Sequence, residues 1–174
     1  MTEYISFDPR VEVSGAVLHA WIAGTQQKIM PYLDAHRVGE VTDAGWYLLQ
    51  PALDALKEFG QDYPLFNAGL LIPEHATFPA TIEPTLSGIF SALDTAYHIN
   101  HRSGEIGHYY FKKVGERAID IRAENPYPCE FDFGLVYCLA KRFAPEGVQI
   151  EVEHDQQAPC RRAGSHSCLY HVQW

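Results

Sequence analysis

The hydrophobic periodicity of this chain changes at about residue 100, and that change restricts the fold more than any other feature of the sequence. Before it, apolar residues recur at helical spacing and predict three helices, at about 15–36, 43–60 and 85–98. Pro31 and Pro51 are expected to kink or divide the first two. The proline-rich stretch from about 61 to 84 is predicted to be irregular.

After the change, strand patterns surround one further helix. Large apolar residues four positions apart predict a helix from Cys129 to Phe143, and Gly115 marks the turn of a predicted hairpin. The predicted strands are 107–114, 117–123, 148–153 and 168–174. The expected fold is therefore α+β, in the order ααα-ββ-α-ββ, with helices packed on an antiparallel sheet. We expect a single domain over 1–174, with a helical N-terminal part at 1–83 and a second part at 84–174.

The charge and hydropathy of the chain exclude several classes of protein. The net charge of −9 disfavours binding to nucleic acid and to acidic lipid surfaces. The first ten residues carry acids and no apolar core, and no run reaches the roughly 18 apolar residues of a membrane span. We therefore expect a cytoplasmic protein without membrane contact, in which cysteines are thiols or metal ligands rather than disulfides.

Three of the four cysteines occupy positions that suit a metal site. Cys160 and Cys168 flank a short loop with Gly164 inside it, a spacing that also suits idle or redox-paired thiols. Cys129 begins the predicted helix, where the helix dipole is expected to lower its thiol pKa. Three thiolates with one further donor would form the tetrahedral site that zinc prefers. Cys138 lies half a turn out of phase with Cys129 and is predicted to be a core residue.

Histidines are the remaining candidate ligands. We favour His154 as the fourth zinc ligand, because a neutral imidazole adds no charge to three thiolates; a solvated role is the alternative for it and for Asp155, His166 and Glu130. His98 and His101 are three residues apart and could share a metal on one helix face. Their place at a predicted helix C-terminus favours a solvated role, in which the imidazoles interact with the helix dipole.

The stretch NPYPCEFDFGLVYCLAKRF, followed by a strand, the C-x7-C loop and an aromatic strand, resembles 4-vinyl-reductase domains. These are relatives of phenol-sensing activator domains and, more distantly, of haem nitric-oxide-binding and TRAPP-type domains. The resemblance covers about 97–174 and implies a TRAPP-like, 4-vinyl-reductase-like fold for the part at 84–174. It also implies a homodimer in which zinc on Cys129, Cys160 and Cys168 braces an apolar pocket. The Tyr-x-Ser-x-Arg motif of haem nitric-oxide domains is absent, and the acidic zinc ligand expected from the phenol sensors has no clear counterpart.

The leading functional hypothesis is a zinc-containing sensory domain that binds an apolar or aromatic small molecule and acts through a partner. One alternative is a protein or enzyme that handles haem or another tetrapyrrole, with His98, His101 or His108 binding the cofactor or moving protons. Another is a structural assembly subunit without catalytic activity. Periodicity directs six residues to the helix–sheet interface, where they would line the pocket or simply fill the core: Tyr97, Tyr109, Phe111, Phe131, Leu135 and Tyr170.

Overall fold

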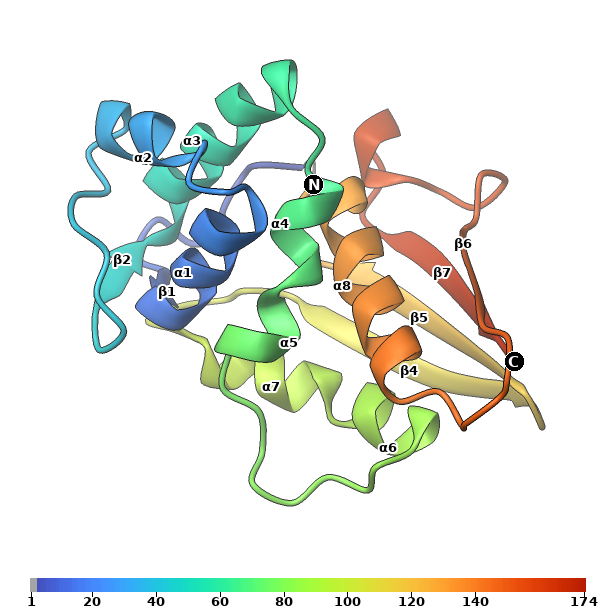
Figure 1. Cartoon of the computed structure of the whole chain (residues 1–174). Coiled ribbons are helices and arrows are strands. Elements are labelled where there is room, and N and C mark those ends of the chain that lie inside the picture. Colours follow the sequence, from blue (N-terminus) through green and yellow to red (C-terminus); the bar gives the residue numbers. More distant parts are fainter. Residues whose placement is uncertain (1–2) are drawn as a thin grey trace.

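The computed structural model describes residues 3–174 and confirms a mixed α+β fold with antiparallel sheets (Figure 1). Its larger sheet has the order β4-β5-β7-β6, and neighbouring strands in it are antiparallel. The predicted hairpin is confirmed as β4–β5. The strands are β4 (His108–Gly115), β5 (Ala118–Glu124), β6 (Glu151–His154) and β7 (Cys168–Gln173).

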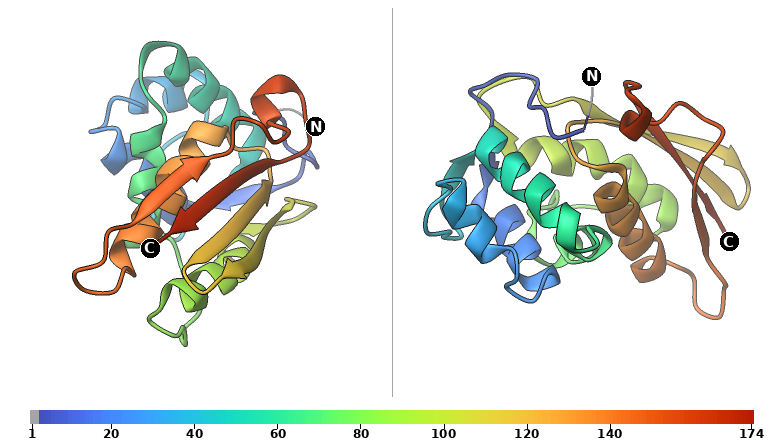
Figure 2. Two further views of the ribbon diagram at one scale, coloured as in Figure 1. Left: turned by 90° about the vertical axis from the view of Figure 1, so that its right-hand side faces the viewer. Right: turned by 90° about the horizontal axis from the view of Figure 1, so that it is seen from above.

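Helix α8 (Cys129–Arg142) packs on one face of this sheet, and the views in Figure 2 show the opposite face without a covering helix. The burial of β5 follows from that arrangement. Ile119 and Ile121 are fully buried on the helix side, whereas Asp120 and Arg122 alternate with them. The predicted helix at 129–143 is thus confirmed to within one residue.

The N-terminal part is built of short helices and a second, small sheet of order β2-β1-β3. The small sheet joins β1 (Glu12–Ser14) to β2 (Trp46–Leu48) and β3 (His101–Arg102), so it holds the start of the chain against residue 101. The helices are α1 (Gly15–Gly24), α2 (Met30–Ala35), α3 (Leu49–Asp62), α4 (Phe66–Leu70), α5 (Ile72–His75), α6 (Leu86–Ser91) and α7 (Leu93–Ile99).

Several predicted boundaries are wrong. The helix predicted at 15–36 is two helices, because Gln26 and Gln27 adopt positive φ angles of 53° and 65°, which interrupt the right-handed helical conformation between them. Pro31 lies in the first turn of α2, where its missing N–H costs nothing. The region 61–84, predicted to be irregular, contains α4 and α5. The predicted order ααα-ββ-α-ββ is therefore not confirmed. Its ββ-α-ββ part matches β4, β5, α8, β6 and β7, but the described residues before β4 form seven helices and three short strands.

Two glycines let α4 and α8 cross at backbone contact. A Cβ atom at Gly69 would overlap the carbonyl oxygen of Phe131, and a Cβ atom at Gly134 would overlap that of Phe66. Each helix therefore places its glycine against the other helix's backbone. This crossing fixes α8 between the sheet and the N-terminal helices (Figure 1).

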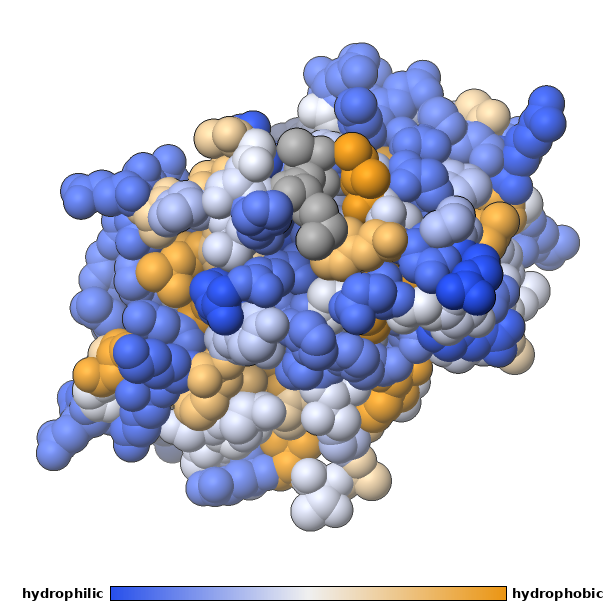
Figure 3. All heavy atoms as spheres, turned by 180° about the vertical axis from the view of Figure 1, so that it is seen from behind, coloured by the Kyte–Doolittle hydropathy of each residue, from blue (hydrophilic) through white to orange (hydrophobic). Residues whose placement is uncertain are grey.

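The surface seen from behind is mainly hydrophilic, with apolar side chains in small separate groups (Figure 3). Within residues 3–174, no helix combines the length and the hydropathy that crossing a bilayer requires.

Candidate functional site

The structure brings together the four residues predicted to bind zinc. Cys129 begins α8, His154 ends β6, Cys168 begins β7, and Cys160 lies in the loop between those two strands. One sulfur or nitrogen atom from each lies within 4.8 Å of those of the other three. The cluster forms because β6 and β7 pair directly and α8 starts beside them, so that residues distant in sequence meet at one corner of the sheet.

The donor atoms are chemically suited to zinc. The Nε2 atom of His154 is buried and has no hydrogen-bond partner among residues 3–174, which leaves a lone pair or a proton without use. The Sγ atom of Cys168 accepts hydrogen bonds from the backbone N–H and Nε of Arg161, both at 3.4 Å, and lies 3.7 Å from Cys160 Sγ. Three sulfurs and one imidazole are a donor set that closed, structural zinc sites use.

The thiolate is favoured at Cys168 rather than at Cys129. The hydrogen bond from Cys129 and the nearby charge of Arg161 hold the pKa of Cys168 well below its usual value. The same hydrogen bond, together with burial and the carboxylate of Glu3, raises the pKa of Cys129. Glu3 accepts the backbone N–H of Cys129 at 2.6 Å, so its negative charge occupies the helix N-terminus. The prediction of a lowered pKa at Cys129 is therefore wrong.

The other candidate ligands lie outside the cluster. Asp155 accepts the backbone N–H groups of Gln157 and Ala158 and contacts His171, so its carboxylate is committed to the loop. Glu130 and His166 are not members of the group of four. Cys138 is also outside it, as predicted, but it is half-buried rather than a core residue, and burial together with the nearby carboxylate of Glu74 raises its pKa.

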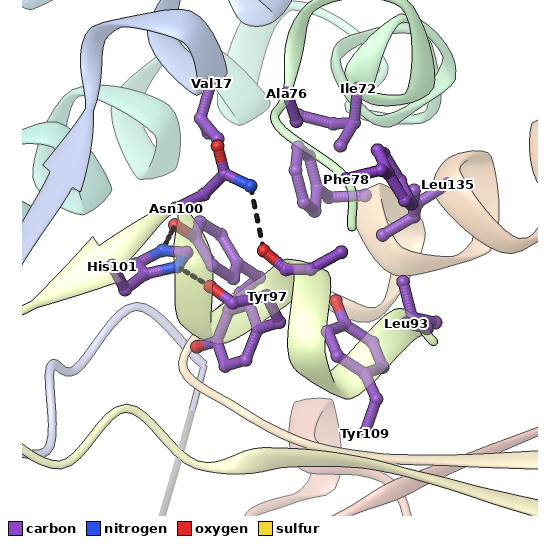
Figure 4. Close-up of a pocket in the computed structure, with 13 residues that line it drawn as sticks. Val17, Ile72, Ala76, Phe78, Leu93, Tyr97, Asn100, His101, Tyr109 and Leu135 are labelled. Carbon is purple, nitrogen blue, oxygen red and sulfur yellow. Dashed lines mark hydrogen bonds between the residues drawn. The ribbon is translucent and has the colours of Figure 1, made fainter. Parts of the chain in front are cut away.

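A second feature is a small apolar cavity of about 40 Å³ between the helices and the large sheet (Figure 4). Its wall comes from α1, α5, α7, β3, β4 and α8, together with two irregular segments. The coil after α5 supplies Ala76 and Phe78, and the segment before α8 supplies Tyr127. Asn100 and His101 lie on one side of it, and apolar side chains such as Ile72 and Leu135 lie on the other (Figure 4).

His101 forms the polar corner of this cavity. Its Nδ1 atom lies 2.8 Å from the carbonyl oxygen of Tyr97, which can only accept, so Nδ1 carries the proton. Nε2 therefore accepts from the hydroxyl of Tyr127 at 2.6 Å. Burial lowers the pKa of His101 to about 4, and the imidazole is neutral near pH 7. The solvated role predicted for His101 is wrong. His101 lies in β3, where its imidazole packs against the rings of Tyr97 and Tyr127, rather than at an exposed helix end.

Four of the six predicted pocket residues lie on the cavity: Tyr97, Tyr109, Phe131 and Leu135. Phe111 and Tyr170 do not, because of where they lie in the sheet. Phe111 is one pleat further along β4, where the strand runs past the cavity and the ring is only partly buried. Tyr170 is fully buried, but it stacks on His154 and donates its hydroxyl proton to the carbonyl oxygen of Cys129, so it belongs to the cysteine cluster.

A buried polar chain joins the cysteine cluster to the cavity. Arg161, which contacts Cys168 Sγ, also forms an ion pair with Asp132 of α8. Asp132 in turn accepts the hydroxyl of the cavity residue Tyr109 at 2.5 Å. No feature of the sequence predicted this series of buried polar contacts, since an arginine in a loop ordinarily lies in solvent.

His98 lies outside the cavity, on the exposed side of α7. It is next to His108 of β4, with 4.9 Å between the ring centroids, and not next to His101 as its spacing suggested.

The chain matches no family model and no curated protein. Solved structures of H-NOX proteins have a similar fold. The H-NOX protein from S. oneidensis in the Fe(II)NO state aligns with a TM-score of 0.66 at 15% identity, covering 92% of this chain and 98% of that one. Unliganded Fe(II) H-NOX from K. algicida gives 0.59 at 11%, covering 92% and 95%. An oxygen-binding H-NOX domain related to soluble guanylate cyclases gives 0.60 at 13%, covering 92% and 94%. The TM-scores show a likeness of fold, whereas identities of 11% to 15% show nothing beyond it.

Proposed function

We propose that this chain is a sensory domain that binds an apolar or aromatic small molecule in the cavity between α7, α8 and β4. The cavity, apolar except at the corner formed by Asn100 and His101, carries this proposal. Ligand pockets in proteins commonly combine apolar walls with a few placed polar groups. The polar groups here already have partners, so apolar contact would supply most of the affinity.

The cavity must enlarge to hold such a ligand. Its volume of about 40 Å³ is small beside the roughly 150 Å³ of an engineered cavity that binds benzene. The coil after α5, which bears Phe78, forms part of the wall and has no regular structure. Asn100 holds this coil through two hydrogen bonds to the backbone of Thr77, at 3.0 and 2.7 Å. We propose that displacement of this coil admits the ligand.

We further propose that zinc binds Cys129, Cys160, Cys168 and His154 as a structural ion. The buried, unpartnered Nε2 atom of His154 beside three sulfurs supports this assignment. Four protein donors would close the coordination sphere and leave no site for a substrate. The ion would tie the loop between β6 and β7 to the start of α8.

Haem in the same cavity is a second candidate. The likeness to H-NOX structures and the presence of a buried imidazole, His101, on the wall favour it. The residues do not fit haem in the conformation described. The cavity is far below the roughly 300–1,000 Å³ of pockets for drug-sized ligands, and the free lone pair of His101 is taken by Tyr127. Its lining contains no Lys or Arg to pair with carboxylates.

Two measurements on the purified protein separate these candidates. The first is an absorbance spectrum after expression with a haem precursor, and the second is a thermal-shift screen with phenols and other small aromatic compounds. A colourless protein whose melting temperature rises with one aromatic class, in a concentration-dependent way, supports the first proposal. A Soret band that is lost in His101→Ala would favour haem. If the protein shows neither a thermal shift nor a Soret band, the structural-subunit hypothesis is favoured.

A sensory domain of this kind would pass its signal to a partner protein. We propose that a second copy of this chain is one such partner. The oligomeric state in solution, measured by light scattering with and without the ligand, tests that part of the proposal.

A further inference from the structure

The structure points to a second metal site, separate from the cysteine cluster and at the opposite edge of the large sheet, where β4 rather than β6 is the outer strand. We propose that Asp94, His98 and His108 bind one divalent transition-metal ion. The ligand atoms of these three residues lie within 4.8 Å of one another. They come from two elements, since Asp94 and His98 are on α7 and His108 begins β4.

The helix geometry places the first two ligands on one face. Asp94 and His98 are four residues apart, so their side chains emerge one above the other. His108 approaches from the strand, and its Nδ1 atom is 3.3 Å from both carboxylate oxygens of Asp94. The two imidazole rings lie 4.9 Å apart at an interplanar angle of 34°. Small side-chain rotations would bring all three donors to bonding distance from one ion.

The surroundings of these residues resemble those of metal ligands. Nδ1 of His98 lies 2.8 Å from the backbone carbonyl oxygen of Asp94 and must donate to it, which leaves the lone pair on Nε2 free. Metal-binding histidines commonly donate their other N–H to a carbonyl or carboxylate in this way. The backbone N–H of Tyr109 donates to Oδ1 of Asp94 at 2.9 Å and holds that carboxylate in place.

The chemistry of the donors and their exposure select the ion. Two imidazoles and one carboxylate suit Zn²⁺, Co²⁺, Ni²⁺ or Cu²⁺, whereas Ca²⁺ and Mg²⁺ prefer oxygen ligands. The side chains of His98 and His108 are each 42% exposed and that of Asp94 is 38% exposed, so water reaches the remaining coordination positions. The site is thus open, unlike the cluster of Cys129, Cys160, Cys168 and His154.

The position of the site gives the ion a structural effect. Tyr97 of α7 and Tyr109 of β4 both line the cavity and directly adjoin the two histidines in sequence. An ion bound by both elements would join two walls of the cavity. Metal binding here would therefore stabilise the protein and change the affinity of the cavity for its ligand.

Titration with Co²⁺ tests the proposal on protein whose cysteine cluster already holds zinc. Wild-type protein should bind one further Co²⁺ per chain, with d–d absorbance and no sulfur-to-cobalt charge-transfer band. His98→Ala and His108→Ala should each weaken this binding by at least about 10- to 100-fold. His36→Ala is the matched control, because His36 also faces a single carboxylate, that of Glu58, but has no third donor within residues 3–174.

A second readout does not depend on the variants folding. In the wild-type protein, Co²⁺ should broaden the backbone amide NMR signals around Asp94, His98 and His108 before any others. Broadening centred elsewhere, absence of a further equivalent of Co²⁺, or wild-type affinity for Co²⁺ in both histidine variants would each overturn the proposal.

Discussion

Arg161 and Asp132 form an ion pair that is almost completely excluded from solvent, with side-chain exposures of 1% and 0%. Each partner has further contacts that compensate its burial. Asp132 accepts hydrogen bonds from Tyr109 and Asn125, and Arg161 donates to Asn125 and to Cys168. The pair therefore connects the loop of the cysteine cluster to α8 and to the cavity.

Removing one member of this pair should be costly. We expect Arg161→Met to lower the free energy of unfolding by about 3–5 kcal/mol, because it leaves the Asp132 carboxylate buried without a counter-charge. Urea denaturation measures the loss. Arg10→Met is the control, since the Arg10–Asp8 pair lies at the surface, where ion pairs contribute little to stability. Equal losses in the two variants would contradict the importance assigned to burial.

Metal content should depend on three cysteines and not on the fourth. We expect about one zinc per chain in the cysteine cluster, lost in Cys129→Ser, Cys160→Ser and Cys168→Ser and retained in Cys138→Ser. The measurement is metal analysis after dialysis against a weak chelator, in His98→Ala background so that the second site does not contribute. Zinc retained in Cys160→Ser but lost in Cys138→Ser would refute the assignment.

Removal of that zinc should loosen the structure locally before the domain unfolds. The loop from Asp155 to Ser167 contains little regular structure and is closed by His154, Cys160 and Cys168. Without the ion, its ends lose their link and its amides should exchange with solvent faster. Hydrogen exchange with and without a chelator measures this, and the hairpin β4–β5 serves as the internal control. Unchanged protection of the loop after confirmed zinc loss would argue against a structural role.

The size of the cavity predicts the effect of a larger side chain at position 135. Leu135→Trp adds more atoms than a cavity of about 40 Å³ takes without movement of its walls. We expect a loss of about 1–3 kcal/mol from overpacking, together with loss of any thermal shift caused by an aromatic ligand. Leu139→Met, a change of similar volume at a fully buried position of the same helix that is not on the cavity, is the control. A ligand response that survives Leu135→Trp would place the ligand elsewhere.

The buried imidazole of His101 should make the protein less stable in acid. Burial lowers its pKa to about 4 from 6.5, so between these values the unfolded chain binds a proton that the folded chain does not. Stability should therefore fall by about 1.4 kcal/mol per pH unit as the pH decreases from 6.5 to 4. Denaturation at pH 7.5 and pH 5 should show this loss in the wild type and a smaller one in His101→Gln.

His171 provides the control of opposite sign. Its hydrogen bond to Asp120 raises its pKa, so its stabilising contribution is present below 6.5 and is lost as the pH rises through the raised value. His171→Gln should therefore steepen the loss of stability in acid. A variant of either histidine with the wild-type pH dependence would contradict these assignments.

Long periodic stretches made part of this structure predictable. Helix α8 and the hairpin β4–β5 each extend over enough residues for their hydrophobic period to be read. The three cysteines could also be singled out, because Cys129 and Cys168 begin predicted elements and Cys160 lies in the loop that leads to Cys168. By contrast, the small sheet has strands of two or three residues. Its pairing joins positions 32 to 36 residues apart in β1 and β2, and 88 or 90 residues apart in β1 and β3. No local pattern indicates such contacts.

The burial of single polar residues was equally hidden from the sequence. His101 is buried because Tyr127, 26 residues later, covers it and because β3 pairs with β1. Arg161 can be buried because it pairs with Asp132, which lies 29 residues earlier on α8. In both cases the compensating partner comes from a distant element, and periodicity carries no information about it.

The crossing of α4 and α8 at Gly69 and Gly134 determines which parts of the domain can transmit a change of shape. Because the two backbones touch there, α8 can neither slide nor rotate without collision. If a ligand enters the cavity as proposed, α8 would stay in place, and the walls that move would be α7 and the coil that bears Phe78. The direction of any signal would accordingly be away from the sheet, toward the surface that α7 and this coil present to a partner.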